Sequence, residues 1–466
     1  MMRPRSILTL LVALAAAQVL SLPATAQLGR RFPSEKKVVT DPVTGVALTF
    51  LTSTPAGDSK IYPTHPQWTS DGQWVVFRSN RVRGQAMAVN EQTGDIVQVT
   101  ETGYVGALCV AQKSMRLFFL RPENHTDPDA YPRPPQPGQP RVERPRVALE
   151  VVAIDLARLF ADSAANKLQP AANYERVFGK IPADMGIGSE LALDAEEDMV
   201  YFRLTKEAAA KILPPDTKIA DTFGPRNMGA GPSGVGKMKL ATGEVSAVVA
   251  VPFQVGHIQS NPWKAGEIVF CWETGGKSPQ RAWTVMADGS GLRKLYPEAP
   301  YDWVTHEAVI GPDEVAIAIM GHRKPGTDDA WGPSGTRVHP TGLGIINLRN
   351  DHIYIAGQTK SGSGLWHVHG SPDGRWATGD DFARSLYLID RRTNEMMLLT
   401  AGHKDTAADH IHPTFHPDGT RIQIQSAMLS EDNRSMNICI VPVPKEWLAR
   451  TYDEKVHPSK SDGGKP

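Results

Sequence analysis

The stretch HPTFHPDG at residues 412–419 decides the fold, because related stretches return elsewhere in the chain. They are HPQWTSDG at residues 65–72 and HGSPDG at residues 369–374. In each copy an Asp-Gly pair separates two short strand-like runs, which is the pattern of a β-hairpin with a tight turn. After the copy at 369–374 come two more strand-like runs, at residues 385–390 and 396–400. The repeating unit therefore has about four strands, the size of one blade of a β-propeller.

Weaker copies of this unit fill the middle of the chain. They begin near Gly106, near Leu191, at His257 and at His306. With the clearer copies they make about seven units, which is within the usual range for a closed ring of blades. Long amphipathic helical patterns are scarce. The sequence therefore predicts an all-β, seven-bladed β-propeller; a β-sandwich is the alternative, and the regular period favours the ring.

The first 26 residues have the pattern of a secretory signal peptide. Arg3 and Arg5 precede an apolar run, and small residues follow it up to Ala26. This run is too short for a comfortable membrane span, and no later stretch is apolar enough for one. We therefore expect a signal peptide over residues 1–26, no membrane span, and a protein located in a periplasm or secreted.

The remaining chain is expected to form one propeller domain over residues 27–454. Residues 121–146 are rich in proline and polar residues, which predicts a long loop within that domain. Residues 455–466 have the composition of a disordered tail.

Composition excludes several functions. The chain has 50 Lys and Arg against 50 Asp and Glu, so its charge gives no basis for a nucleic-acid partner. The hydrophobic settings of the cysteines favour buried free thiols, and no Cys-x-x-Cys pair suggests a zinc ribbon. GPSGVGK at residues 231–237 resembles a phosphate-binding loop, but Met238 stands where that motif needs Ser or Thr. We interpret this segment as a flexible loop between strands.

Three histidines form a candidate metal site. His410 and His412 stand two apart at the start of a predicted strand, which places both side chains on one face. His367 occupies the matching place in the preceding unit. Because inner strands line the channel of a propeller, these imidazoles are expected to converge on a divalent ion such as manganese or zinc. Exposed or hydrogen-bonded loop histidines are the alternative interpretation.

Further polar residues stand at the starts of other inner strands. His306 and His257 each open one, and a neutral imidazole is suited to proton abstraction. Arg281 carries a fixed positive charge that could hold a carboxylate. His65 opens the first repeat. We assign His257, His65 and Arg281 to substrate binding.

The ordered set of these residues resembles the oligogalacturonate lyases, β-propeller enzymes that degrade short pectin fragments. The resemblance covers nearly the whole chain after the signal peptide. The matching segments are GRRFPSE at 29–35, DPVTG at 41–45, VGH at 255–257, THE at 305–307, TGD at 378–380 and HIHP at 410–413. The histidines, taken in order with Arg281, are its most specific part.

The resemblance implies a role for each candidate residue. His306 corresponds to the catalytic base and Arg281 to the charge-neutralising arginine of the family. His367, His410 and His412 correspond to ligands of a divalent metal, usually Mn²⁺. The implied activity is metal-dependent β-elimination on an acidic oligosaccharide, which gives a 4,5-unsaturated uronate.

Two departures from the family pattern bear on the substrate. The family has a glutamine ligand three residues before the His-x-His pair, and this chain has Ala407 there. Asp409, His369 or water could complete the metal shell. Familiar members of the family are cytoplasmic, whereas this chain is predicted to be exported. A related uronate-containing glycan is therefore an alternative to oligogalacturonate.

Two other functional classes compete with a lyase. A TolB-like periplasmic binding propeller shares the Ser-Pro-Asp-Gly turn at 371–374 and does not need converging histidines. A prolyl-oligopeptidase-like hydrolase would need a Gly-x-Ser-x-Gly nucleophile elbow, which the sequence lacks. The binding module is the stronger competitor.

Overall fold

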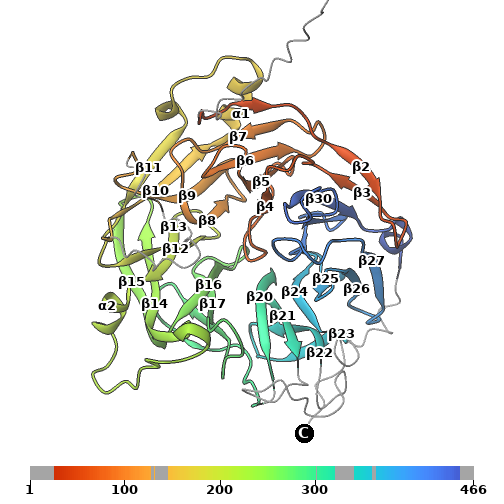
Figure 1. Ribbon diagram of the computed structural model, residues 1–466. Helices are drawn as coiled ribbons and strands as arrows, with labels where there is room; N and C mark the ends of the chain where they lie inside the picture. Colours follow the sequence, from red (N-terminus) through yellow and green to blue (C-terminus); the bar gives the residue numbers. More distant parts are fainter. Residues whose placement is uncertain are drawn as a thin grey trace, which may run out of the picture.

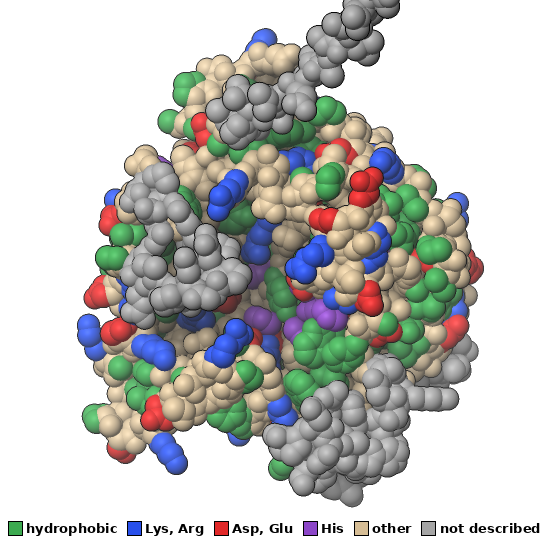
Figure 2. Space-filling model, in the orientation of Figure 1, with side chains coloured by type: hydrophobic (Ala, Val, Ile, Leu, Met, Phe, Trp, Pro, Cys, Tyr) green, Lys and Arg blue, Asp and Glu red, His purple; other side chains and the backbone are tan. Residues whose placement is uncertain are grey.

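The computed structural model shows a β-propeller of seven antiparallel sheets arranged in a ring (Figure 1), with a hollow at its centre, called the channel below (Figure 2). This confirms the predicted fold class. The residues described are 26–126, 131, 145–300, 302–320, 341–358 and 364–451. Residues 1–25 of the predicted signal peptide, the predicted tail and most of the predicted loop lie outside these ranges. Strand β9 extends to Pro122, so the start of that predicted loop is a strand.

Each blade has its strands in order from the channel outward. The first three blades are β4 (Asp58–Lys60), β5 (Trp74–Ser79), β6 (Gln85–Asn90), β7 (Ile96–Gln98) and β1 (Arg31–Phe32); β8 (Val105–Val110), β9 (Arg116–Pro122), β10 (Leu149–Asp155) and β11 (Glu175–Ile181); and β12 (Gly186–Leu193), β13 (Met199–Leu204), β14 (Ala230–Lys239) and β15 (Glu244–Phe253).

The next three blades are β16 (Val255–Ser260), β17 (Glu267–Trp272), β18 (Ala282–Met286) and β19 (Arg293–Lys294); β20 (Val304–Gly311), β21 (Glu314–Met320), β22 (Thr341–Asn347) and β23 (Ile353–Gln358); and β24 (Leu365–Gly370), β25 (Trp376–Asp381), β26 (Leu386–Asp390) and β27 (Met396–Thr400). The last is β28 (Thr414–Phe415), β29 (Arg421–Ser426), β30 (Asn437–Pro442), β3 (Ala47–Phe50) and β2 (Lys37–Thr40). The described helices are short: α1 (Leu156–Ala164), α2 (Lys206–Ala210) and α3 (Lys445–Leu448), with 3-10 turns at Ala171–Asn173 and Pro225–Asn227.

The repeats predicted from the sequence coincide with the blades. The weaker copies near Gly106 and Leu191 fall on inner strands β8 and β12. In the three clear copies the glycine of the turn has a positive φ: 68° at Gly72, 71° at Gly374 and 71° at Gly419. Glycine adopts this conformation without the steric cost that a Cβ brings, so the Asp-Gly pairs make the tight turns between the first two strands of a blade.

The ring is closed by strands from both ends of the chain. Strand β3 pairs with β30, with Thr49 opposite Ile440 and Phe50 opposite Cys439. Figure 1 shows β2 and β3, near the red end of the colour scale, beside the blue β30. Phe50 is fully buried in the core cluster that spans the last two blades. Burial of this apolar surface holds the two ends of the chain together.

Two other expectations have clear outcomes. The three cysteines are free and buried, as predicted. The expectation of a flexible loop at residues 231–237 was wrong, because this segment lies within β14 and pairs with both β13 and β15. A Cβ at Gly234 would come within 2.2 Å of the Val249 carbonyl oxygen, and one at Gly236 within 2.5 Å of the Phe202 ring. Close packing therefore requires these glycines.

The described helices include none with the length and apolar character needed to cross a membrane.

We expect Phe50→Ala to destabilise the protein by about 3–5 kcal/mol, because it empties a fully packed position in the closing blade. Val38 on the neighbouring strand β2 is 68% exposed, so Val38→Ala is the matched control and should change the free energy of unfolding by less than about 0.5 kcal/mol. Urea unfolding followed by tryptophan fluorescence measures both. Equal effects of the two substitutions would contradict a role for Phe50 in closing the ring.

Candidate functional site

A β-bulge recurs near the start of the inner strands and aims side chains into the channel. The ladder to the second strand shifts at Val105/Leu108, Ile187/Leu191, Gly256/Gln259, Thr305/Ala308 and Leu365/Val368. Residues within a bulge lack a ladder partner and bend the strand, which re-aims their side chains. His257, His306 and His367 all lie within such bulges.

Two of these histidines have an uncommon backbone conformation. The φ angle is 48° at His257 and 52° at His306, and it is 51° at His412. A positive φ costs free energy in a residue with a Cβ, and such strain is often found at functional sites. His410 and His412 also precede β28, which begins at Thr414. The prediction that His410 and His412 open a strand, whose period places both side chains on one face, was therefore wrong: the two residues lie in the segment before β28.

Figure 2 shows histidine side chains in a hollow at the centre of the disc, with lysine and arginine side chains around it. The imidazole centroids of His306 and His367 are 4.2 Å apart, and those of His367 and His412 are 3.8 Å apart. His410 lies 5.4 Å from His367 by the same measure. The structure therefore brings the three predicted metal ligands and the predicted base together.

One buried carboxylate connects two of the predicted ligands. Asp380 on β25 is fully buried, and its Oδ1 lies 3.2 Å from His367 Nδ1 while its Oδ2 lies 3.3 Å from His410 Nδ1. The backbone N–H of His367 also donates to Asp380 Oδ1 (2.6 Å). The ligand atoms of His367, Asp380 and His410 all lie within 4.8 Å of one another, so these residues could hold a metal ion.

The protonation states at this group suit metal binding. Burial, and then the neighbouring His412, lower the pKa of His367 to about 3, although Asp380 acts in the opposite direction. Burial alone would raise the pKa of Asp380, but its contacts with His367 and His410 outweigh burial and hold the pKa below its ordinary value. A neutral imidazole and an ionised carboxylate are the forms that bind a divalent cation, so the residues present fit one.

Asp409, two residues after Ala407, also places a carboxylate near the predicted metal ligands. Asp409 Oδ1 lies 3.4 Å from His412 Nε2. Ala407 instead packs in a small apolar cluster with Ala427 and Met436. His369 Nδ1 is engaged by the Gly370 carbonyl oxygen, 2.9 Å away. Of the protein groups considered for completing the shell, Asp409 is the one placed against a predicted ligand.

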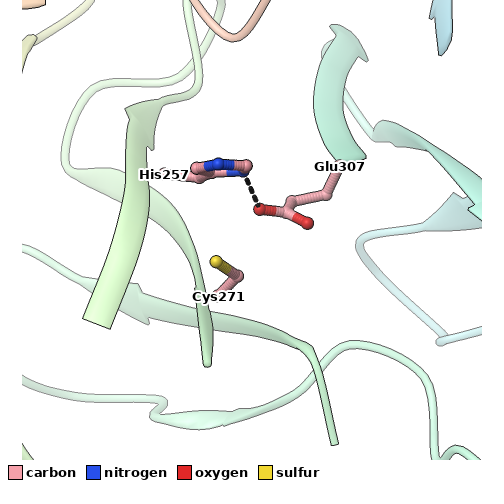
Figure 3. A group of neighbouring side chains, drawn as sticks. All are labelled: His257, Cys271 and Glu307. Atoms are coloured by element: carbon pink, nitrogen blue, oxygen red, sulfur yellow. Dashed lines mark hydrogen bonds and ion pairs between the residues drawn. The ribbon is translucent and has the colours of Figure 1, made fainter. Parts of the chain in front are cut away.

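A second cluster faces these histidines from β16, β17 and β20. Figure 3 shows His257, Cys271 and Glu307 pointing toward one another. His257 Nδ1 lies 2.9 Å from Glu307 Oε1, and Arg281 Nε donates to Glu307 Oε2 over 3.0 Å. Arg281 Nη2 also donates to Glu273 Oε2 over 3.2 Å. Both Arg281 and Glu307 are buried.

This second cluster is better described as an ion-pair group than as a metal site. Burial raises the pKa of Glu307, but the charges of Arg281 and His257 outweigh burial and bring the pKa to about 2. Burial raises the pKa of the Cys271 thiol far above its ordinary value, so the sulfur keeps its proton. The guanidinium of Arg281 already supplies the positive charge that the carboxylates need.

His306 lies between the two groups. Its Nδ1 is 2.6 Å from the hydroxyl of Tyr62, and its ring is 4.5 Å from that of Trp366. Its Nε2 is buried and has no hydrogen-bond partner within the part of the chain that the structure describes. Burial, and then the neighbouring His367 imidazole and the charge of Arg281, hold the pKa of His306 well below its ordinary value. The imidazole is therefore neutral and can accept a proton.

His65 lies apart from these contacts. Its Nε2 contacts the Leu191 carbonyl oxygen and its Nδ1 contacts the Thr64 hydroxyl, each at 2.7 Å. With Ser260 and other residues it lines a cavity of about 250 Å³. Both ring nitrogens are thus engaged by the protein, and the assignment of His65 to substrate binding stays a prediction.

Sequence reasoning missed Asp380, Glu307, Glu273 and Tyr62. Asp380 and Glu307 belong to segments that carry the family resemblance, TGD at 378–380 and THE at 305–307, so a signal for them was present. Glu273 and Tyr62 lie outside the repeated motifs. Only the three-dimensional placement of their strands and loops brings them to the site.

The comparisons with known proteins agree with this fold. Neither a scan against models of protein families nor a search of curated protein sequences gives a match. Among solved structures, an oligogalacturonate lyase in complex with manganese has a TM-score of 0.66 and 16% sequence identity, covering 90% of this chain and 99% of its own. An oligogalacturonate lyase from Vibrio parahaemolyticus has a TM-score of 0.65 and 17% identity, covering 90% of this chain and 100% of its own. At these identities the likeness shows a shared fold.

We expect Asp380→Asn to weaken the binding of Mn²⁺, used as a probe, by about 10–100-fold, because the carboxylate orients two imidazoles of the candidate metal centre. Asp381→Asn is the matched control, since Asp381 accepts from the Ser385 backbone and the Tyr387 hydroxyl instead. Calorimetric titration measures the affinity directly. An affinity in Asp380→Asn equal to that of the control would contradict the role given to Asp380.

Proposed function

We propose that the protein is an exported lyase that cleaves oligogalacturonate, or a related uronate-containing oligosaccharide, by β-elimination. The observation that carries this proposal is the placement of His306. Its Nε2 has no partner among the described residues. The His306 ring stands between the buried Arg281 and the group of His367, Asp380 and His410, called the histidine–carboxylate group below. Whole-chain similarity to two oligogalacturonate lyase structures supports the same proposal.

The chemistry explains why both neighbours of the base are needed. In a uronate, the C5 proton lies beside the C6 carboxylate and is only weakly acidic in water. As that proton leaves, negative charge develops on the carboxylate, and a nearby positive charge stabilises it. A divalent cation held by His367, His410 and His412 would supply part of that charge. Mn²⁺ is the proposed ion, since one of the similar lyase structures holds manganese and imidazole–carboxylate sites accept it.

His306 would act as the base. Its Nε2 takes the C5 proton, the electron pair forms the C4–C5 double bond, and the C4–oxygen bond breaks. The departing oxygen takes a proton from the solvent and becomes a hydroxyl group, and His306 releases the C5 proton to the solvent, so the protons balance and the base is regenerated. No water is consumed, so the reaction needs no pair of carboxylates of the kind used in glycoside hydrolysis.

Arg281 would share the charge of the substrate carboxylate. In the structure its Nη2 donates to Glu273, whose side chain is 18% exposed, whereas its Nε donates to the fully buried Glu307. The bond to Glu307 therefore fixes the guanidinium in place. A substrate carboxylate arriving from the channel would compete with Glu273 for Nη2. His257 would line the same subsite.

One assay tests the reaction. The purified protein is incubated with Mn²⁺ and a panel of uronic-acid oligosaccharides, and the ultraviolet absorbance of an unsaturated uronate is followed. We expect absorbance with at least one member, and its suppression by a chelator. No signal with any member would overturn the lyase and favour the binding module.

We expect His306→Ala to abolish turnover while the bound metal content persists, because His306 supplies the base and the histidine–carboxylate group remains. His416→Ala is the matched control. His416 is also buried, but it contacts Trp68 and Asp418 outside the cluster. Turnover by steady-state kinetics and metal by atomic absorption separate the two properties. Full activity in His306→Ala would refute the assignment of the base.

A further inference from the structure

An insertion in the first blade reaches the central histidines. Lys60 pairs with Phe77 and Trp68 pairs with Val75, so residues 61–67 stand opposite the single residue Val76. This is a much larger interruption than the bulges of the other inner strands. The insertion lies on the inner side of the first blade, at the position where the inner strands of other blades have their bulges. Tyr62 is one of its residues.

The insertion is held in a defined conformation. The buried Gln67 side chain donates to the carbonyl oxygens of Tyr62 (3.2 Å) and His65 (2.7 Å). The His65 N–H also donates to the Tyr62 carbonyl oxygen (3.0 Å). His65 Nε2 contacts the Leu191 carbonyl oxygen on β12, which ties the insertion to another blade. These bonds fix the backbone from which the Tyr62 ring projects.

Tyr62 occupies the space between the histidines. Its ring centroid lies 4.8 Å from that of His257, 5.3 Å from His412, 6.0 Å from His367 and 6.5 Å from His306. Its hydroxyl is 2.6 Å from His306 Nδ1, a short hydrogen bond. Burial, and then the negative charge of Glu307, hold the pKa of Tyr62 well above its ordinary value, so the phenol keeps its proton.

This hydrogen bond has two possible directions with different consequences. If the phenol donates to Nδ1, the imidazole proton sits on Nε2, which is buried and has no acceptor among the described residues. A buried N–H without an acceptor costs about 1–3 kcal/mol. If Nδ1–H donates to the phenol oxygen, Nε2 presents a lone pair, which is the form required of a base. In that second direction the phenol O–H has no acceptor among the described residues, so each direction leaves one buried donor unpaired. The base role proposed for His306 is what requires the second direction, because it needs the lone pair on Nε2.

We propose that Tyr62 is a positioning residue of the lyase reaction: its phenol oxygen accepts the Nδ1–H of His306 and holds the imidazole in the tautomer whose Nε2 can take the substrate proton. The role rests on the proposed function, in which His306 is the base. Neither the repeated motifs nor the family resemblance points to Tyr62. Because the bond is made to the far nitrogen of the base, Tyr62 acts through His306.

The first test is kinetic. We expect Tyr62→Phe to lower kcat by about 10–100-fold, less than the roughly 100–10,000-fold that a general base itself contributes, because the variant still has His306; KM should change less than about 2-fold. Tyr174→Phe is the matched control, because Tyr174 is also buried and its hydroxyl donates to Asp162 on helix α1 (2.8 Å). It should leave both constants unchanged. A Tyr62→Phe enzyme with the kcat of the control would overturn the proposal.

The second test observes the tautomer directly and needs no substrate. Protein labelled with ¹⁵N-histidine is chelated, to avoid broadening by a paramagnetic ion, and long-range ¹H–¹⁵N correlations are recorded. His306→Gln identifies the signals of His306. We expect a proton on Nδ1 in the unaltered protein and a mixture of tautomers in Tyr62→Phe. A proton on Nε2 in the unaltered protein, or the same tautomer in both, would overturn the role of Tyr62.

The two tests also separate this role from the proposed reaction. If no uronate is cleaved by the unaltered protein, the lyase is refuted and the spectrum alone decides what Tyr62 does to His306. If cleavage occurs and the spectrum shows the Nε2–H form, the lyase stands and the role of Tyr62 fails.

Discussion

The pairing of β3 with β30 is the constraint on which the rest of the structure depends. It joins the two ends of the chain in one blade, and Phe50 packs there in a core shared with the preceding blade. An open arc of blades could splay apart, whereas a closed ring fixes the distances between neighbouring inner strands. Those distances decide whether side chains from β16, β20 and β24 can meet. The site therefore depends on a contact made by strands that contribute none of its residues.

Within the closed ring, the β-bulges place side chains of the repeated inner strands in the candidate site. A regular strand would send alternate side chains into the two neighbouring blade interfaces, where apolar residues pack. The bulges at Gly256/Gln259, Thr305/Ala308 and Leu365/Val368 release one or two residues from that alternation. The same position is a glycine with φ of 69° at Gly106 on β8. The backbone shape is thus a property of the blade, and the side chain placed on it determines whether that blade contributes to the site.

The difference between contacts that are local in the sequence and contacts between distant segments explains what the sequence could and could not predict. Asp-Gly turns such as that ending at Gly374 are local, so the repeats and the blade number follow from short stretches. His367 and His306 were identified because they recur at matching places in the repeat. Tyr62 could not be found in that way, because its contact with His306 crosses 244 positions of the chain and depends on an insertion. The sequence pointed to the segment TGD at 378–380 but not to a role for Asp380 itself. That role depends on the pairing of β24 with β25 and on the placement of Asp380 against the imidazoles of His367 and His410.

The charges around His306 bear on why the proposed reaction would use a cation. Removing Arg281 from water is unfavourable unless it is paired, and Glu307 pairs it while also holding His257. Glu273 adds a second carboxylate on that side. On the other side, burial keeps His367 neutral while Asp380 stays ionised. The side chains of this cluster, taken together, therefore carry little excess positive charge with which to hold the carboxylate of the proposed substrate. A divalent cation on the histidine–carboxylate side would supply it next to the base, so affinity for a uronate and acidity of its C5 proton would both depend on the same ion.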